Sequence, residues 1–333
     1  MQFVGASLDL KTIEYRQLSD IMIIFAIVQF LGLLVVVYAT SGSVYVSSST
    51  PTLFETPSSL VIYVAYIVFA SLAIVLISKY YGGRKFFILL EAFVIFIASL
   101  YLFLIAFSSL NSSVAFAIDG TPITYSGIAA IALAAALVIM KNKWQRLRNS
   151  VAIIASAGVG VVLGLSFGFK LALIFMGIIA IYDFIAVFIT KHMITLARAA
   201  SSMNLALLVG VSEVKAVPEK SVPKDYLKAY RKEMSRQGPH PLSKELGKHM
   251  IPFAARVELG TGDLAIPLMV AVSAYNYTLN FVLSFFIIFG AIFGLGLTMY
   301  ILKRFSRPLP AIPPLFLGVL IGVLAFFLLH PYI

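Results

Sequence analysis

Two carboxylates in apolar surroundings are the residues of this chain that are best placed to do chemistry. Asp183 and Asp263 each lie within a stretch of hydrophobic residues. A carboxylate at the centre of a membrane helix costs about 2.5–3.5 kcal/mol on insertion scales, so such a residue is a candidate for function by default. If the two carboxyl groups faced each other, they would share one proton and could together activate water and polarise a carbonyl group. Their expected chemistry is acid–base hydrolysis.

The residues around the second aspartate predict a weakened helix. Gly260, Thr261 and Gly262 precede Asp263, and a glycine in a helix interior costs about 1 kcal/mol relative to alanine. Pro267, four residues later, lacks the amide that would bond the carbonyl of Asp263. We therefore expect a helix that is bent or opened here, so that the carboxyl group can be aimed.

A third candidate element is the proline-rich segment 308–314, which holds four prolines in seven residues. This density predicts extended backbone. Irregular backbone at membrane depth is tolerated only where it is buried in protein or lines a polar cavity. We expect Pro310, Ala311 and Ile312 to border a water-accessible cavity, and we hypothesise that free backbone groups there hold an unwound substrate segment.

The composition places these residues in a membrane protein. Hydrophobic residues make up 61% of the 333, charged residues only 12%, and the mean hydropathy is +1.00. The chain has no cysteine and four scattered histidines, so no metal-ligand set is visible and no cofactor is expected. We expect a multi-pass protein of the cell membrane.

The apolar runs predict an all-α protein with nine transmembrane helices. Their expected bounds are 21–40, 60–78, 86–108, 125–140, 150–169, 171–192, 251–273, 278–301 and 309–329. Counted over the connections, 24 of the 25 Lys and Arg residues fall on one side. By the positive-inside rule the N-terminus is cytoplasmic and the C-terminus is on the opposite side. This distribution also explains the net charge of +11 without a nucleic-acid partner.

The expected organisation is one membrane domain interrupted by a polar loop. Residues 1–200 carry spans one to six, 201–250 form a cytoplasmic loop, and 251–333 carry spans seven to nine. Within the loop, the polar segment 212–250 has a candidate short helix around Asp225–Arg236. It is interpreted as a solvated connection near anionic headgroups, with a regulatory or substrate-gating role as the alternative.

Simple depth arithmetic brings the two aspartates together. Asp183 precedes Lys191 by eight residues, which is roughly 12 Å along a helix, and Asp263 follows Arg256 by seven, roughly 10 Å. Carboxyl groups in lipid need polar partners. We therefore expect the two side chains to face each other from consecutive helices. Glycines at 158, 160, 164 and 168 predict close packing of span five, and Glu91, near a span end, is expected to snorkel.

These motifs together resemble the presenilin and signal peptide peptidase family of intramembrane aspartyl proteases. Tyr182-Asp183 is similar to the Tyr-Asp motif of that family, residues 260–263 to its Gly-x-Gly-Asp motif, and residues 310–312 to its Pro-Ala-Leu motif. The chain looks most like a compact archaeal-type presenilin homologue. Thr261 and Ile312 stand where the family usually has leucine.

The resemblance implies an aspartic endopeptidase that cleaves transmembrane or signal-peptide-like substrates within the membrane. Asp183 and Asp263 would be its catalytic pair, supported by Tyr182, Gly260, Thr261, Gly262 and Pro267. The segment Pro310, Ala311 and Ile312 would position the substrate. Tyr182 would act through a hydrogen bond or through packing alone.

Other interpretations of the carboxylates stay open at this point. They could form a structural contact between helices, or serve an ion or proton transport pathway. A prepilin-peptidase-type protease also carries Gly-x-Gly-Asp, although the other two motifs argue against it. The sequence leaves open whether the chain forms a homo-oligomer.

Overall fold

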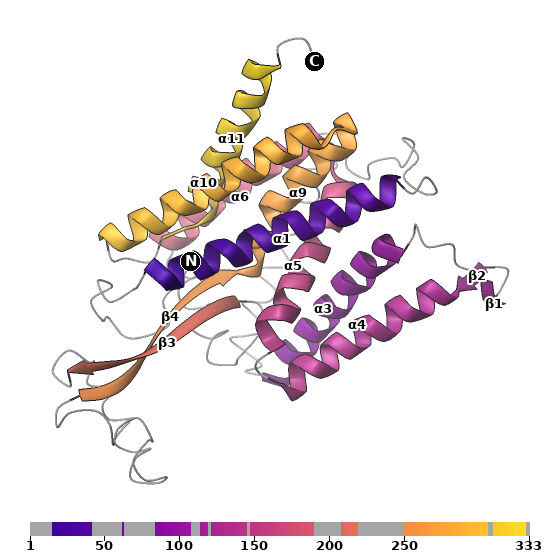
Figure 1. The fold of residues 1–333 in the computed structure, drawn as a ribbon, viewed down its shortest axis with the longest axis horizontal. Coiled ribbons are helices and arrows are strands. Elements are labelled where there is room, and N and C mark those ends of the chain that lie inside the picture. Colours follow the sequence, from indigo (N-terminus) through magenta and orange to yellow (C-terminus); the bar gives the residue numbers. More distant parts are fainter. Residues whose placement is uncertain are drawn as a thin grey trace, which may run out of the picture.

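A computed structural model describes residues 15–41, 62, 84–107, 114–118, 121–144, 147–189, 208–218, 250–305 and 309–330. Eight helices occur within these residues (Figure 1): α1 (Tyr15–Ser41), α3 (Arg84–Phe107), α4 (Tyr125–Lys143), α5 (Arg148–Ser166), α6 (Phe169–Phe188), α9 (Thr261–Thr278), α10 (Phe281–Phe305) and α11 (Ile312–Leu329). All except α9 are long and apolar enough to cross a membrane. The expectation of a helical, multi-pass membrane protein is therefore confirmed.

Seven of the nine expected spans coincide with a described helix over most of their length. The second span, 60–78, lies outside the described residues except for position 62, and the candidate helix around Asp225–Arg236 lies wholly outside them. The span count of nine and the orientation of the termini therefore stay predictions.

The expected seventh span, 251–273, is wrong in its first half. Residues Met250–Gly260 form the strand β4, which pairs antiparallel with β3 (Leu208–Pro218), in a register that runs from Pro218 opposite Met250 to Leu208 opposite Gly260. The beginning of the predicted polar segment 212–250 is thus also strand. A second ribbon joins β1 (Val114–Ile118) to β2 (Thr121–Thr124) just before α4.

Alternating apolar residues explain why β3 and β4 are strands. Val209 lies opposite Leu259, and Val211 lies opposite Val257, so both cross-strand pairs occupy the same face of the ribbon. Val209, Val257 and Leu259 are buried, and Val211 packs against the same core. Their period of two in apolar character is that of a strand, and Glu258 on the other face of β4 is buried as well. The apolar run before Asp263 therefore belongs to the ribbon.

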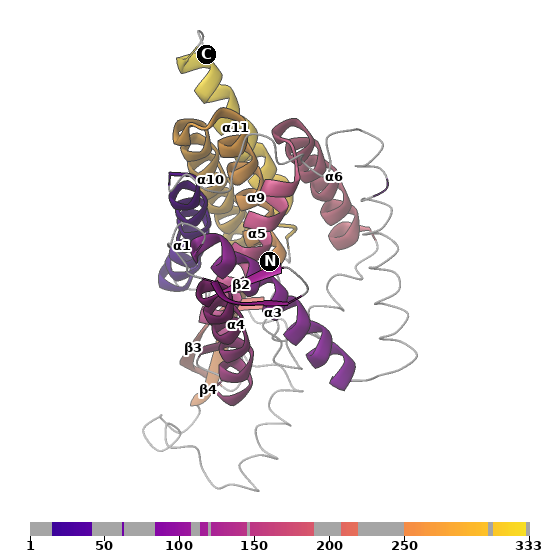
Figure 2. The ribbon, with the colours of Figure 1, turned by 90° about the vertical axis from the view of Figure 1, so that its right-hand side faces the viewer.

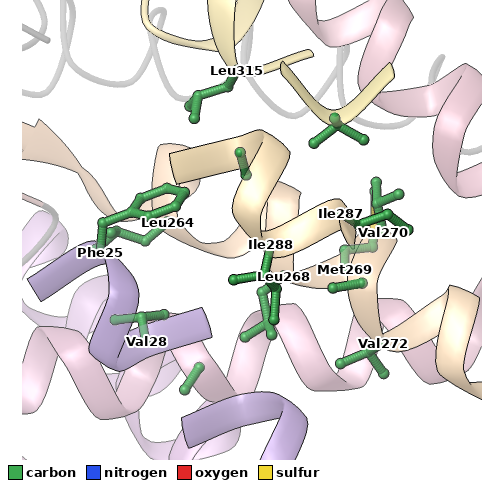
Figure 3. Close-up of a cluster of buried hydrophobic side chains, with 14 of the residues drawn as sticks. Phe25, Val28, Leu264, Leu268, Met269, Val270, Val272, Ile287, Ile288 and Leu315 are labelled. Carbon is green, nitrogen blue, oxygen red and sulfur yellow. The ribbon is translucent and has the colours of Figure 1, made fainter. Parts of the chain in front are cut away.

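The helix that follows the ribbon is the centre of the molecule. α9 packs against α1, α5, α6, α10 and α11, and α6 lies on the opposite side of α9 from α1 (Figure 2). Every residue of α9 from Pro267 to Tyr275 is buried. Side chains from α1, α10 and α11, including Phe25, Ile288 and Leu315, converge on it (Figure 3). Over these residues α9 is surrounded by the neighbouring helices.

Glycines on α5 allow α9 to approach closely, as the sequence predicts. A Cβ atom on Gly160 would lie 2.9 Å from the carbonyl oxygen of Ala265, and one on Gly164 would lie 2.8 Å from that of Met269. Gly158 abuts α3 in the same way. The prediction is wrong for Gly168, where a Cβ would meet nothing within 4 Å. That residue instead precedes the first turn of α6.

A second glycine contact sets the position of α11. A Cβ on Gly290 of α10 would lie 2.2 Å from the carbonyl oxygen of Gly318, and one on Gly318 would lie 2.1 Å from that of Gly290. Gly294 and Gly322 extend the contact by one turn on each helix, so the two backbones pack directly against each other. The N-terminal end of α11 is thereby held at a defined place.

Glu91 does not snorkel as expected. Its side chain is wholly buried and forms an ion pair with Lys141, at the last turn of α4. The buried residues of α4 are Ala130, Ala134 and Lys141, which lie on one face of the helix because they are four and seven residues apart. The ion pair thus lies at one end of the contact between α3 and α4.

Candidate active site

Asp183 lies where three helices meet. It belongs to α6, which packs against α9 and α11, and only 7% of the residue is exposed. The Ile312 amide donates a hydrogen bond of 3.3 Å to its Oδ2 atom, and the Ala311 amide also donates to the carboxylate. The aspartate on α6 is therefore connected to the predicted Pro-Ala-Ile segment, 129 residues further along the chain.

The start of α11 is built to present that amide. The sequence predicted extended backbone over 308–314, but the helix begins at Ile312, so Pro313 and Pro314 lie in its first turn. Proline is compatible with this turn because the amides there have no intrahelical partner. Its two prolines have no N–H, so Ile312 supplies the donor. The positive end of the helix dipole favours a carboxylate at this position.

This arrangement changes the expected role of the proline segment. Pro310, Ala311 and Ile312 are all buried, as a segment beside an active site should be. The Ile312 amide, however, bonds Asp183 and is not free to hold a substrate. The irregular part that remains is Leu309, Pro310 and Ala311, before the helix.

Asp263 occupies the first turn of α9, not the interior of a helix as expected. Gly260 is the N-cap with extended backbone, and Asp263 is the third residue after it. The Gly260 amide donates to the Asp263 carboxylate, which is half of the reciprocal capping arrangement at helix starts. A Cβ on Gly260 would lie 3.2 Å from Oδ2 of Asp263, so glycine leaves room for the carboxyl group. A Cβ on Gly262 would meet nothing within 4 Å.

The structure brings the two aspartates together. α6 and α9 pack against each other, and the carboxyl groups of Asp183 and Asp263 are close enough to interact electrostatically. The depth arithmetic that predicted this meeting was wrong for Asp263, because the residues before it are strand and not helix. Their electrostatic interaction fits the expectation that the two carboxyl groups lie near each other, and that they face each other stays a prediction.

Two further expectations concern residues next to the pair. Pro267 does not open the helix, since α9 continues from Thr261 to Thr278. It does leave the carbonyl of Asp263 without its usual amide donor. Tyr182 is half-buried and precedes Asp183 on α6, and its part in the site stays a prediction, as does that of Thr261.

Two amide side chains that the sequence analysis did not single out hold the surroundings of Asp263. Asn149, at the start of α5, bonds both backbone groups of Gly210 in β3: its Nδ2 lies 2.8 Å from the carbonyl oxygen, and its Oδ1 lies 3.4 Å from the amide nitrogen. Gln29 of α1 donates to the carbonyl of Leu264, at 2.8 Å. Gln29 could have been found as a lone amide inside the apolar run 21–40.

Within the part of the chain that the structure describes, no three His, Asp or Glu side chains are grouped so that they could hold a metal ion. The described site thus consists of two carboxylates, the backbone amides that bond them, and the helix ends that carry these amides.

Comparisons with known proteins identify the family of this chain. The family model described as signal-peptide peptidase, presenilin aspartyl protease matches residues 22–330. A presenilin family intramembrane aspartate protease solved in space group C222 is 20% identical, with a TM-score of 0.59, and the match covers 94% of this chain and 99% of the other. One solved in space group P2 is 21% identical, with a TM-score of 0.57 and coverages of 93% and 97%.

The two solved structures show that this chain has the same fold. No curated protein matches significantly. The family model spans nearly the whole chain, and it includes both aspartates and the segment at residues 310–312. The chain therefore belongs to the signal-peptide peptidase and presenilin family of intramembrane aspartyl proteases.

Proposed function

We propose that Asp183 and Asp263 are the catalytic pair of this protease. The observation that carries the proposal is their meeting between α6 and α9, within electrostatic range of each other, in a protein whose family hydrolyses peptide bonds with aspartates. The backbone amides of Ile312 and Gly260 orient the two carboxyl groups. The orientation of each carboxyl group is thus set by a hydrogen bond from the N-terminal end of a helix.

In the proposed reaction, the pair shares one proton. The ionised carboxylate takes a proton from a water molecule, which attacks the carbonyl carbon of the substrate, while the protonated carboxyl group donates to the carbonyl oxygen. The tetrahedral intermediate then collapses as the leaving nitrogen receives a proton. The C–N bond breaks, and an amine and a carboxylic acid are released.

The proposed substrates are transmembrane or signal-peptide-like segments, since α9 meets two helices at the site, α6 and α11, that are long and apolar enough to cross a membrane. The amide and carbonyl groups of an intact substrate helix bond each other, so the segment must unwind before water can reach a peptide bond. We assign the positioning of this segment to residues 309–311, together with the start of α11. Membrane lipid surrounds the helices, and no nucleic-acid partner is proposed.

The proposal is tested by incubating the purified protein with a membrane-spanning peptide and identifying the products by mass spectrometry. Two fragments that sum to the substrate plus one water are expected. The alternative, an ion or proton pathway, would give flux across a vesicle membrane without fragments. Family membership does not support that alternative, and a preparation that conducts ions but makes no product would reverse this conclusion.

Replacing Pro310 with alanine is expected to impair cleavage. Pro310 is buried next to the amides that bond Asp183, and alanine would allow the helix to extend toward residue 309, so that these amides turn away from the carboxylate. We expect roughly a tenfold loss of the rate, as a small misplacement of a catalytic group can produce. A Pro313→Ala variant is the matched control, because proline is tolerated but not required in the first turn. Full activity of Pro310→Ala would contradict the assignment.

We also propose the nine-span topology, as one membrane domain with a cytoplasmic N-terminus. The native chain has no cysteine, so single cysteines can be labelled without background. Asn142→Cys, at the end of α4, is expected to be protected from an impermeant thiol reagent added outside the cell, whereas Asn280→Cys, between α9 and α10, is expected to react. Equal labelling of both from outside would refute the orientation.

A further inference from the structure

Gln29 is an amide buried in the middle of a membrane helix. It lies on α1 with none of its surface exposed. Its Nε2 atom donates to the carbonyl oxygen of Leu264, 235 residues away in the sequence, over a distance of 2.8 Å. Phe25, one turn earlier on the same face of α1, packs over Leu264 (Figure 3). The side-chain amide of Gln29 therefore bonds the first turn of α9 within an apolar contact between α1 and α9.

This placement carries an energetic cost. Among the described residues, no hydrogen-bond donor reaches the buried Oε1 atom of Gln29. A carbonyl oxygen can only accept, so the NH₂ group must face Leu264 and the amide cannot turn to satisfy its own oxygen. A leucine or methionine here would avoid the cost. A polar group that weakens the fold in this way calls for an explanation.

The partner of Gln29 supplies that explanation. Leu264 directly follows Asp263, in the first turn of α9. Pro267 has no N–H, so the helix cannot hold the carbonyl of Asp263 in the usual way. The turn that carries this carboxylate thus lacks one of its backbone bonds. The hydrogen bond from Gln29 restrains the same turn at the next carbonyl.

We propose that Gln29 is a positioning residue for Asp263, which it orients by fixing the first turn of α9 from α1. This inference rests on the proposed role of Asp263. Gln29 touches neither water nor substrate in the proposed reaction, and it acts through the backbone at Leu264. Its removal should therefore slow the chemical step without weakening substrate binding.

A second bond between the same two helices supplies a matched control. Thr40 of α1 and Tyr275 of α9 share a hydrogen bond of 2.8 Å between their hydroxyl groups. Tyr275 follows Leu264 by eleven residues, which is roughly 16 Å along the helix. Thr40→Val removes a hydrogen bond between α1 and α9 but leaves the turn at Asp263 untouched.

The experiment compares Gln29→Met, Gln29→Glu and Thr40→Val with wild type, using the full-length protein and a membrane-spanning peptide. Gln29→Met keeps the volume and removes the donor, and kcat is expected to fall roughly tenfold while KM changes less than about twofold. Thr40→Val is expected to leave kcat and KM unchanged. Gln29→Glu can donate only when its carboxyl group is protonated, so its activity relative to wild type should rise as the pH falls.

Several outcomes would overturn the inference. Wild-type kcat in a folded Gln29→Met protein would do so, as would equal losses in Gln29→Met and Thr40→Val, which would indicate a general packing role. If Gln29→Met does not fold, as judged by its thermal unfolding midpoint, Gln29→Glu decides: a loss of activity that does not recover as the pH falls contradicts the proposal. Failure of the proposed function itself is distinct, because wild type would then give no product.

Discussion

Replacing either Asp183 or Asp263 with alanine is expected to abolish cleavage. One aspartate takes a proton from the attacking water while the other donates a proton to the substrate carbonyl oxygen, so the reaction needs both. General acid–base catalysis by a positioned side chain raises the rate about 10²–10⁴-fold. The two groups act as a unit, so each single variant should lose about as much rate as the double variant. The measurement is the initial rate of fragment formation from a membrane-spanning peptide.

Isosteric variants and a distant carboxylate provide the controls. Asp183→Asn and Asp263→Asn keep the shape of the side chain but cannot exchange the proton, so they should be as inactive as the alanine variants. Asp20→Asn, on α1 and outside the proposed site, should retain wild-type activity. A single aspartate variant that folds and keeps more than about a tenth of the wild-type rate would exclude that residue from the catalytic pair.

The catalytic candidates could be predicted from the sequence because their signal is local. A carboxylate among apolar residues is costly wherever the chain places it, so Asp183 and Asp263 stand out without knowledge of the fold. The same local reasoning placed most of the helices within a few residues of their observed bounds. It also indicated that the glycines of α5 lie at a close helix contact.

The start of α9 could not be predicted in this way. The run before Asp263 is apolar enough to belong to a helix, and only its pairing with Leu208–Pro218 makes it a strand. This pairing joins residues between 32 positions (Pro218 and Met250) and 52 positions (Leu208 and Gly260) apart in the sequence, so a local pattern does not reveal it. The residues of Gly-x-Gly-Asp consequently form a helix start, where Gly260 is the N-cap and leaves room for the Asp263 carboxyl group.

Both aspartates interact with the N-terminal end of a helix. Asp263 lies in the first turn of its own helix, and Asp183 accepts from the first turn of α11. Helix N-termini offer unpaired amides and a positive dipole, which offset part of the cost of carboxylates in an apolar interior. The bond from Ile312 to Asp183 could not be expected from either motif alone, since it depends on how α10 places α11. The glycine contact at Gly290 and Gly318 thereby supports the site from a distance.

Breaking the buried ion pair between Glu91 and Lys141 is expected to destabilise the protein strongly. Both side chains are almost fully buried between α3 and α4, so Glu91→Gln or Lys141→Met leaves one charged group without its counterion. Removing one partner of a buried pair typically costs about 3–5 kcal/mol. The free energy of unfolding, measured with denaturant in detergent micelles, should fall by about this amount in each single variant.

The double variant Glu91→Leu/Lys141→Met separates the ion pair from simple packing. It leaves no buried charge, and an apolar replacement of a buried pair is often neutral or even stabilising, so it should be more stable than either single variant. Neither α3 nor α4 carries a proposed site residue, and the folded fraction of each variant should therefore cleave substrate at the wild-type rate. Additive losses in the double variant would show that the two charges do not stabilise each other. The contact between α3 and α4 would then rest on Ala130, Ala134 and their apolar neighbours alone.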